Sequence, residues 1–438
     1  MNEKEFNDFI KASSRLIEIP SVLSEPLEKQ PFGVNVDRAL QETLIIAEEL
    51  GFETYCDPNG YYGYAQIGDG EQLFGILCHV DVVPAGDLSK WQSNPFKLEI
   101  RDDKIYGRGI QDDKGPTILS MYALKHLLDQ GLIPKQKIRF IFGTDEENLW
   151  RCMANYTKNE KIPDMGIVPD SIFPVTYAEK GLFQFDLISS EKISFDLEGG
   201  EAYNSVASSA QTKTNDILQK NLSKTKINYE ISDGQVKVIG KSAHVKDADQ
   251  GENAIVILAQ LLKDSNYQAK MLDFIVDKLD DVHGKSLFGD ISDDISGKLM
   301  LNLGKACFQE DHQRIALDLR VPVSYPQAEV EAVLKKACAE YDLSFELVDY
   351  VKPLYVNVNS DLVKKLMEAY QNVTKDYESK PMSSGGATYA RTMPNFVAFG
   401  TDLITSESTA HQANEHVRID DYKLAFDIYV EAYRLLVF

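Results

Sequence analysis

Two histidines and a series of acidic residues are spaced along the sequence in a way that could build a metal centre. His79-Val80-Asp81 follows an apolar run, and Asp112-Asp113, Asp145-Glu146-Glu147, Asp170 and His411 come after it. Two imidazoles and several carboxylates are enough ligands for a pair of bridged divalent metal ions. One glutamate, Glu146, would then remain to handle a proton, which a hydrolase requires and a purely structural metal site does not.

Each of these segments also has a structural interpretation. An isolated H-x-D is typical of a hydrogen-bonded histidine, and Asp112 or Asp113 alone could cap a helix, because acids are favoured at helix N-termini. A solvated loop would explain residues 145–147. A phosphate-binding G-x-x-x-x-G-K-[ST] motif does not occur in the sequence. A metal centre therefore requires that the surrounding elements bring these residues together.

The first 180 residues alternate between helical and strand patterns. We expect helices at residues 5–18, 36–50 and 116–130, and strands at residues 52–56, 62–67, 73–78, 137–142 and 164–168. Such alternation predicts a largely parallel sheet flanked by helices. His79, residues 145–147 and Asp170 each follow a strand, and ligands collect outside the carboxyl ends of strands in open α/β sheets. The acids and His79 are therefore expected to converge.

The pattern changes between about residues 182 and 353. Short alternating runs occur at residues 183–188, 235–239, 298–302 and 314–320, with helical stretches at residues 207–219 and 252–262. A helix at 361–373 and a strand at 395–399 then resume the first pattern. The predicted fold class is α/β. A discontinuous catalytic domain (residues 1–182 and 355–438) has a mixed, largely parallel sheet flanked by helices, and an α+β lid domain (residues 183–354) is inserted in it.

Composition restricts the partners and the compartment. The net charge of −22 over 438 residues excludes a nucleic-acid partner and disfavours anionic membrane surfaces. No apolar run approaches the length of about 20 residues that spans a bilayer, and the acidic N-terminus does not resemble a signal peptide. Five widely spaced cysteines without a C-x-x-C pair predict reduced thiols in a cytoplasmic protein.

Four segments resemble the co-catalytic zinc aminoacylase, carboxypeptidase and dipeptidase family: residues 78–86, 107–115, 143–147 and 410–412. The chain is most similar to the bacterial PepV-like dipeptidases of that family. This closer resemblance depends on Trp150 and Tyr156 and on residues 169–175, 178–181 and 385–391, so that it extends over essentially the whole chain, in order.

The resemblance implies that Asp112 bridges two divalent metal ions. His79 and Asp170 would complete the ligands of one ion, and Glu147 and His411 those of the other. The family also has a cis peptide bond after the bridging aspartate, here between Asp112 and Asp113. The ligand types suit Zn²⁺, and Mn²⁺ and Co²⁺ accept similar sets.

Further roles follow from the same resemblance. Asp81 would orient His79, and Glu146 would be the general base that takes a proton from a water held between the metals. In the insert, His244 would polarise the scissile carbonyl, and the substrate would be held by Asn204, Arg320 and the glycine-rich loop with Gly385 and Gly386. Arginine suits a peptide's C-terminal carboxylate, because its planar fork pairs in bidentate fashion.

Two stretches depart from the family pattern. Ala387 stands where relatives often have a third glycine, and residues 402–405 replace a stretch that usually bears proline and glycine. Both lie where one end of the substrate is expected to be recognised, so they bear on specificity.

The function implied by the resemblance is two-metal hydrolysis of short unmodified peptides by a dipeptidase. In the related dipeptidases the enlarged insert replaces a second subunit, which implies a monomer, and the insert is expected to move on hinges near Gly181 and Pro353. Two alternatives remain at this point. One is an N-acyl amino acid deacylase or carboxypeptidase with the same metal centre, and the other is a non-catalytic metal or peptide binder, which would have no use for Glu146.

Overall fold

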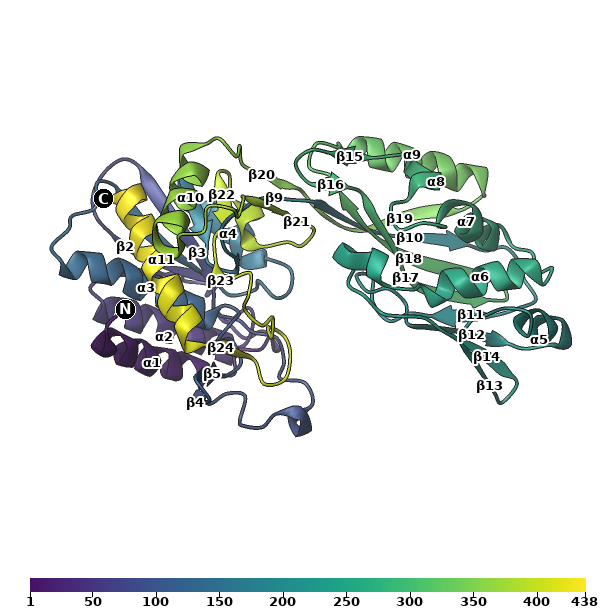
Figure 1. Cartoon of the computed structure of the whole chain (residues 1–438), viewed down its shortest axis with the longest axis horizontal. Coiled ribbons are helices and arrows are strands. Elements are labelled where there is room, and N and C mark those ends of the chain that lie inside the picture. Colours follow the sequence, from purple (N-terminus) through teal and green to yellow (C-terminus); the bar gives the residue numbers. More distant parts are fainter. The chain divides into compact units, whose positions relative to one another are not determined.

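The computed structural model describes residues 1–438, which form two compact units (Figure 1). Unit 1 consists of Met1–Tyr177, Tyr355–Met382 and Thr388–Phe438, and unit 2 of Ala178–Leu354 and Ser383–Ala387. The first unit is therefore discontinuous. The short return of residues 383–387 to unit 2 has no counterpart in the predicted domain bounds.

A mixed sheet forms the centre of unit 1, and its middle strands are parallel. Its order is β1-β2-β6-β3-β7-β22-β9-β20, and β21 pairs with β9. Strand β3 pairs in parallel with β6 and β7, and β22 with β7, whereas β1, β2 and β9 pair antiparallel. The bounds are β1 (Glu53–Cys56), β2 (Tyr62–Ile67), β3 (Leu73–His79), β6 (Lys137–Gly143), β7 (Met165–Val168), β9 (Thr176–Glu179), β20 (Leu354–Tyr355), β21 (Met382–Ser384) and β22 (Phe396–Ala398). The predicted fold class is thus confirmed.

Six α-helices flank this sheet: α1 (Glu3–Ile17), α2 (Val34–Glu49), α3 (Lys114–Asp129), α4 (Arg151–Asn159), α10 (Asp361–Thr374) and α11 (Ile419–Val437). Asn2 begins α1 with a capping box, and Ser360 caps α10. Helix α11 packs against α3 and α10 (Figure 1). No helix in the chain combines the length and the apolar character needed to cross a membrane.

Several short helices and strands of unit 1 lie outside the main sheet. They comprise the 3-10 helices η1 (Leu88–Lys90) and η3 (Tyr389–Thr392), a three-stranded sheet of β4 (Glu99–Arg101), β5 (Lys104–Tyr106) and β24 (His416–Arg418), and a parallel pair of β8 (Ser171–Ile172) with β23 (Thr401–Asp402). Residues close to Asp112 and His411 in the chain are thereby joined by backbone pairing, because His416 lies opposite Tyr106.

Unit 2 contains an eight-stranded sheet of order β13-β14-β12-β11-β17-β18-β10-β19. Its bounds are β10 (Gly181–Ser189), β11 (Leu197–Gly199), β12 (Ser209–Lys213), β13 (Tyr229–Ser232), β14 (Gln235–Ile239), β17 (Met300–Gln309), β18 (His312–Val321) and β19 (Ser344–Val351). Alternate residues such as Phe183, Phe185 and Leu317 enter one apolar core with helix residues such as Leu258 and Leu334. The unit also has α5 (Asp216–Leu222), α6 (Ala254–Asp264), α7 (Lys270–Lys278), α8 (Lys285–Phe288), α9 (Gln327–Glu340), η2 (Val245–Gln250) and the pair β15 (Ser292–Asp293) and β16 (Gly297–Lys298).

One predicted helix of the insert is wrong. Residues 207–219 form strand β12 and only then begin helix α5. Along β12 the side chains of Ala210 and Thr212 are buried, whereas the residues that alternate with them are less buried, which is the two-residue period of a strand. Asn215 then caps α5 with a side-chain hydrogen bond to the N–H of Leu218. The small and polar residues before Asn215 have a weak hydrophobic period, so the pattern alone does not distinguish this strand from a helix.

All five cysteines are unpaired, as predicted. Cys78, Cys152 and Cys338 are buried, Cys56 is half-buried and Cys307 is exposed. Burial raises the pKa of the Cys152 thiol to about 12 and that of Cys338 to about 11, so both remain protonated at neutral pH.

Candidate metal centre

The candidate ligands lie at the carboxyl ends of three adjacent strands, β6, β3 and β7. His79 is the last residue of β3, Glu147 follows β6, and Asp170 follows β7. Asp112 lies two residues before α3, and the peptide bond between Asp112 and Asp113 is cis, as the resemblance implied. Because neighbouring parallel strands end at the same edge of the sheet, residues far apart in the sequence come together there.

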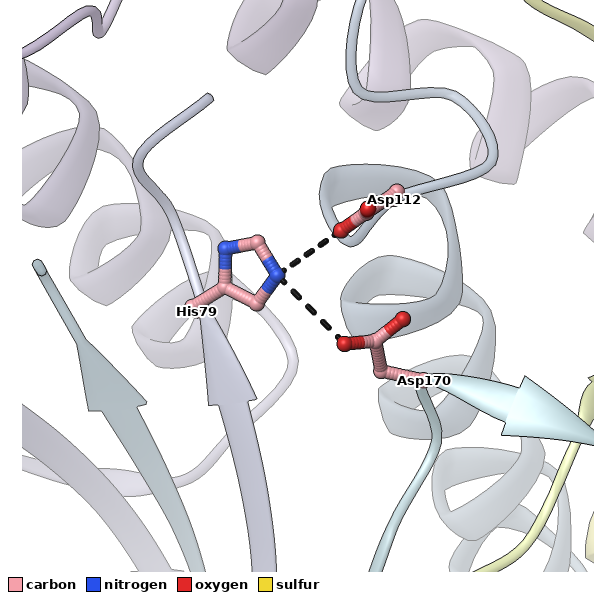
Figure 2. A group of neighbouring side chains, drawn as sticks. All are labelled: His79, Asp112 and Asp170. Atoms are coloured by element: carbon pink, nitrogen blue, oxygen red, sulfur yellow. Dashed lines mark hydrogen bonds and ion pairs between the residues drawn. The ribbon is translucent and has the colours of Figure 1, made fainter. Parts of the chain in front are cut away.

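The first ligand group consists of His79, Asp112 and Asp170 (Figure 2). Nε2 of His79 lies 2.9 Å from Oδ1 of Asp112 and 3.7 Å from Oδ2 of Asp170. The other ring nitrogen, Nδ1, lies 3.0 Å from the backbone carbonyl oxygen of Asp81. Since that carbonyl only accepts, Nδ1 carries the hydrogen in the neutral ring and Nε2 is left with its lone pair toward the two carboxylates.

Asp81 therefore orients His79 through its backbone carbonyl, whereas its carboxylate lies 3.6 Å from Nδ1. That carboxylate instead accepts the backbone N–H groups of Glu146 and Glu147, each at 3.1 Å. One residue thus positions a histidine on β3 and the two glutamates after β6. Asp145, the third acid of that run, pairs with Arg151 through two nitrogen–oxygen contacts of 2.7 Å.

The second ligand group consists of Asp112, Glu147 and His411. Nε2 of His411 lies 3.0 Å from Oδ2 of Asp112 and 3.0 Å from a carboxylate oxygen of Glu147. Asp112 belongs to both groups, because Oδ1 faces His79 and Oδ2 faces His411. A carboxylate with one oxygen directed to each of two imidazoles has the arrangement of a bridging ligand.

The two groups fit divalent cations in donor type and spacing. Within each group the three ligand atoms all lie within 4.8 Å of one another, and imidazole nitrogen with carboxylate oxygen is a donor set that zinc prefers. The carboxylates of Asp112 and Glu147 raise the pKa of His411 to about 11. Protons and metal ions therefore compete for the same nitrogen, as they do in metal sites generally.

Glu146 belongs to neither ligand group, although it adjoins one of the ligands. Its backbone is held at both ends, because the N–H donates to Asp81 and the carbonyl accepts from Nε1 of Trp150 at 2.8 Å. Burial raises the pKa of the Glu146 carboxyl well above its usual range, and the nearby Asp170 and Glu147 raise it further. A carboxyl group that is positioned, and that readily holds a proton, suits acid–base work.

The remaining residues proposed from the sequence lie in unit 2. Arg320 is nearly fully buried, and its Nη1 donates to the carbonyl of Gly385 at 2.9 Å. A Cβ on Gly385 would lie 3.1 Å from Cβ of Lys246, so the glycine permits a close approach of two loops. The N–H of Gly386 donates to the hydroxyl of Ser384 at 2.9 Å. Arg320 and the glycine-rich loop therefore lie together, although Arg320 and Gly385 are 65 residues apart in the sequence.

His244 lies beside Asn204 in the same unit. The N–H of Val245 donates to the carbonyl of Asn204 at 2.9 Å, and Ser205 pairs with His244 in a β-bridge. Nδ1 of His244 accepts the N–H of Lys246 at 3.2 Å. Partial burial lowers the pKa of His244, and the positive charge of Arg320 lowers it further. The neutral ring therefore carries its hydrogen on Nε2, where it can donate to an oxygen.

Sequence reasoning missed three buried residues around the ligands: Gln111, Arg108 and Glu415. Nη1 of Arg108 lies 2.6 Å from Glu415, and both side chains are almost fully inaccessible to solvent. Gln111 is next to Asp112 in the sequence and Glu415 is four residues after His411, and this proximity was a signal. Contacts between positions as far apart as Arg108 and Glu415, which are 307 residues apart, cannot be read from one sequence.

Comparison with known proteins gives consistent matches over the whole chain. The family model described as Peptidase family M20/M25/M40 matches residues 75–434. The Bacillus subtilis protein named "Putative dipeptidase YtjP" is 34% identical over 452 residues, which cover 97% of this chain and 96% of that protein. Among solved structures, an M20 family metallo-carboxypeptidase from Sulfolobus solfataricus aligns with a TM-score of 0.60 at 20% identity, covering 99% of both chains. Human carnosine dipeptidase 1 aligns with a TM-score of 0.59 at 14% identity, covering 98% of this chain and 96% of that one.

Proposed function

The chain belongs to peptidase family M20/M25/M40, and on this premise we propose that it is a two-metal dipeptidase that hydrolyses short unmodified peptides. The observation that carries the proposal is the position of Asp112 between two ligand groups, with Glu146 beside them and outside both. A non-catalytic metal or peptide binder would have no use for such a carboxyl group, so Glu146 favours a hydrolase over a binder.

His79, Asp112 and Asp170 would hold one divalent ion, and Asp112, Glu147 and His411 the other. When bound, two such ions lower the pKa of water and stabilise negative charge on a carbonyl oxygen. The donor types favour Zn²⁺, with Mn²⁺ and Co²⁺ as the other candidates.

Glu146 performs the proton transfers in this proposal. Its carboxylate accepts a proton from the attacking water as the water oxygen bonds to the carbonyl carbon. The same carboxyl then gives the proton to the amide nitrogen, and the carbon–nitrogen bond breaks; the second proton of the water also passes to the leaving nitrogen, so that an ammonium and a carboxylate are released. Asp81 keeps the glutamate in place by holding its backbone N–H, and so acts as a positioning residue.

We propose that residues of unit 2 bind the substrate. The Nε2–H of His244 would donate to the carbonyl oxygen of the scissile bond, in keeping with the tautomer that its Nδ1 contact favours. Arg320 would pair with the C-terminal carboxylate, and Asn204, Gly385 and Gly386 would contact the backbone of the peptide. The clustering of Arg320 with Gly385, and of Asn204 with His244, supports this assignment.

Further parts of the proposal concern the state of the protein. We propose a monomer, because the insert is large, and a cytoplasmic location, which five unpaired cysteines support. Light scattering coupled to size-exclusion chromatography would measure the mass directly; a dimer would contradict the first statement.

The decisive experiment is the Glu146→Gln variant, which removes the proton acceptor and keeps the size of the side chain. Hydrolysis of a dipeptide panel should be lost, while two metal ions still bind as measured by elemental analysis. Unchanged turnover would overturn the proposal. The rate of hydrolysis of N-acyl amino acids by the wild-type enzyme should be measured in parallel, since faster cleavage of these than of dipeptides would favour a deacylase.

A further inference from the structure

The side chain of Gln111 reaches out of its own loop and holds the loop that leads to His411. Its Nε2 donates to Oδ2 of Asp402 and to the carbonyl of Glu407, both at 2.9 Å. Its Oε1 accepts the N–H of Thr409 at 2.8 Å and the N–H of Ala410 at 2.6 Å. Only one orientation of the amide satisfies these partners, because the nitrogen faces acceptors and the oxygen faces donors. Gln111 thus fixes the backbone directly before His411.

The side chain of Glu415 makes the converse connection. Its carboxylate accepts the backbone N–H of Gly109 at 3.0 Å, of Gln111 at 2.9 Å and of Asp112 at 3.3 Å. Arg108 neutralises the carboxylate through Nη1 at 2.6 Å. Glu415 is completely buried, and Gln111 is 5% exposed, so these bonds are shielded from water. Glu415 thus fixes the backbone up to and including Asp112.

The two contacts are reciprocal. Gln111 precedes Asp112 and holds the loop before His411, whereas Glu415 follows His411 and holds the loop before Asp112. Asp112 and His411 are the two members of the second ligand group that come from these loops. The first group draws its other members, His79 and Asp170, from the end of β3 and from the short segment between β7 and β8 (Figure 2). These reciprocal contacts of Gln111 and Glu415, which we call the interlock, therefore affect the spacing of the ligand atoms in the second group more than in the first.

We propose that Gln111 and Glu415 are positioning residues that set the affinity of the second metal site, formed by Asp112, Glu147 and His411. The inference rests on the proposed two-metal centre and extends it, because it assigns different determinants to the two sites. Neither side chain contacts a ligand side chain, because the partners of Gln111 and Glu415 are backbone groups and the side chains of Asp402, Thr409 and Arg108. Loss of such supporting contacts typically weakens metal affinity about 10- to 100-fold.

The test is a titration of the metal-free full-length chain with Zn²⁺ by calorimetry, and with Co²⁺ by visible absorption. In the wild type, two binding events are expected. The Asp170→Asn variant retains the second ligand group intact, and His411→Ala retains the first, so these two variants assign the events to their sites. Gln111→Ala should then weaken only the event that His411→Ala abolishes, by about 10- to 100-fold.

Further variants make the result specific. Gln111→Glu keeps the acceptor oxygen for Thr409 and Ala410 but places a carboxylate against Asp402, so it should weaken the same event even if Gln111→Ala does not fold. Glu415→Gln should do likewise. Gln412→Ala is the matched control, because Gln412 is next to His411 but hydrogen-bonds only within its own loop, to the carbonyl of Ser408 at 3.0 Å.

The outcomes separate the two proposals. Selective weakening of the second event supports the interlock, because a general loss of stability would weaken both events alike. Wild-type affinities at both sites in Gln111→Ala and Gln111→Glu, or equal weakening of both, would overturn the interlock and leave the metal centre standing. A wild-type chain that binds fewer than two ions would overturn the proposed metal centre, and the interlock with it.

Discussion

The guanidinium group of Arg320 is held by the carboxylate of Asp318, with Nε 2.8 Å from Oδ1 and Nη2 3.1 Å from Oδ2. Both side chains are almost fully buried, so the pair is rigid and shielded from water. Such a bidentate contact determines the plane in which the guanidinium group lies, and Nη1, the nitrogen that does not contact Asp318, is directed to the carbonyl of Gly385.

The first prediction concerns this pair. Asp318→Asn should raise KM for dipeptides about tenfold with a smaller change in kcat, because it removes one charged partner of the arginine, worth about 1.5 kcal/mol. Steady-state kinetics with a dipeptide and with its C-terminal amide checks the cause, since the amide lacks the carboxylate and should respond less.

The control for this prediction is Asp186→Asn. Asp186 is equally buried in the same sheet and pairs with Arg314, but it has no contact with the candidate substrate residues. Its KM should remain that of the wild type. Equal KM increases in the two variants would indicate a general effect on unit 2.

The second prediction concerns the shared ligand. Asp112→Ala should lose both metal ions, because Asp112 supplies an oxygen to each group, whereas Asp170→Ala should lose one. Elemental analysis after dialysis against trace metal measures the ratio of metal to protein. Loss of a single ion from Asp112→Ala would contradict the bridging role.

The third prediction is a pH dependence of stability that depends on Asp402. Burial raises the pKa of Asp402 to about 7, and the charges of Asp170 and Asp112 contribute to the rise, while the hydrogen bond from Gln111 opposes it. Between its ordinary value of 3.8 and about 7 the folded chain holds a proton that the unfolded chain has lost. Its contribution to stability is therefore full below the ordinary pKa and is lost as the pH rises toward 7.

Asp402→Asn should flatten this slope, by up to about 1.4 kcal/mol per pH unit, in metal-free protein. Urea unfolding at pH 5, 6 and 7 gives the free energies needed. Asp69→Asn, at an exposed position, is the matched control and should retain the wild-type slope. If the slope of Asp402→Asn equals that of the wild type, the carboxyl does not hold its proton in the folded chain.

The fourth prediction concerns the buried pair of Arg108 and Glu415. Arg108→Met should lower the free energy of unfolding by about 3 kcal/mol, because it leaves a buried carboxylate without its cation. Arg434→Met should lower it by less than about 1 kcal/mol, because Arg434 is half-exposed and lies 3.7 Å from Glu431. Equal losses in chemical denaturation would show that the charge of Arg108 is not needed in the fold.

Much of unit 1 could be predicted from the sequence, because its signals are local. The strand β3 is a continuous apolar run that ends in His79, and Asp112 lies two residues before a helix that has Gly115 and Pro116 in its first turn. Because ligands collect at the carboxyl ends of the strands in such sheets, His79, residues 145–147 and Asp170 were expected to lie together. The resemblance implied the cis peptide bond and the two ligand groups. Helix bounds differ from the prediction by one to two residues at most ends.

The remaining features of the fold and the site depend on contacts between distant residues, which cannot be inferred from one sequence. That the carboxylate of Asp81 holds the N–H groups of Glu146 and Glu147 follows from the packing of β3 against β6. The strand β12 was missed because small residues give a weak period, and Gln111 because a buried amide and an exposed one look alike in a sequence. Non-local hydrogen bonds, in other words, were the missing information.

The order of the ligands along the chain has a consequence for biosynthesis. His79, Asp112 and Asp170 all precede the insert, whereas His411, the central strand β22 and the helix α11 follow it. As a chain leaves the ribosome from its N-terminus, unit 2 is complete but for residues 383–387 before unit 1 has its last sheet strand. On the proposed two-metal assignment, the second ligand group is complete only after His411 has been synthesised, when the ligands of the first group and the whole insert are already present.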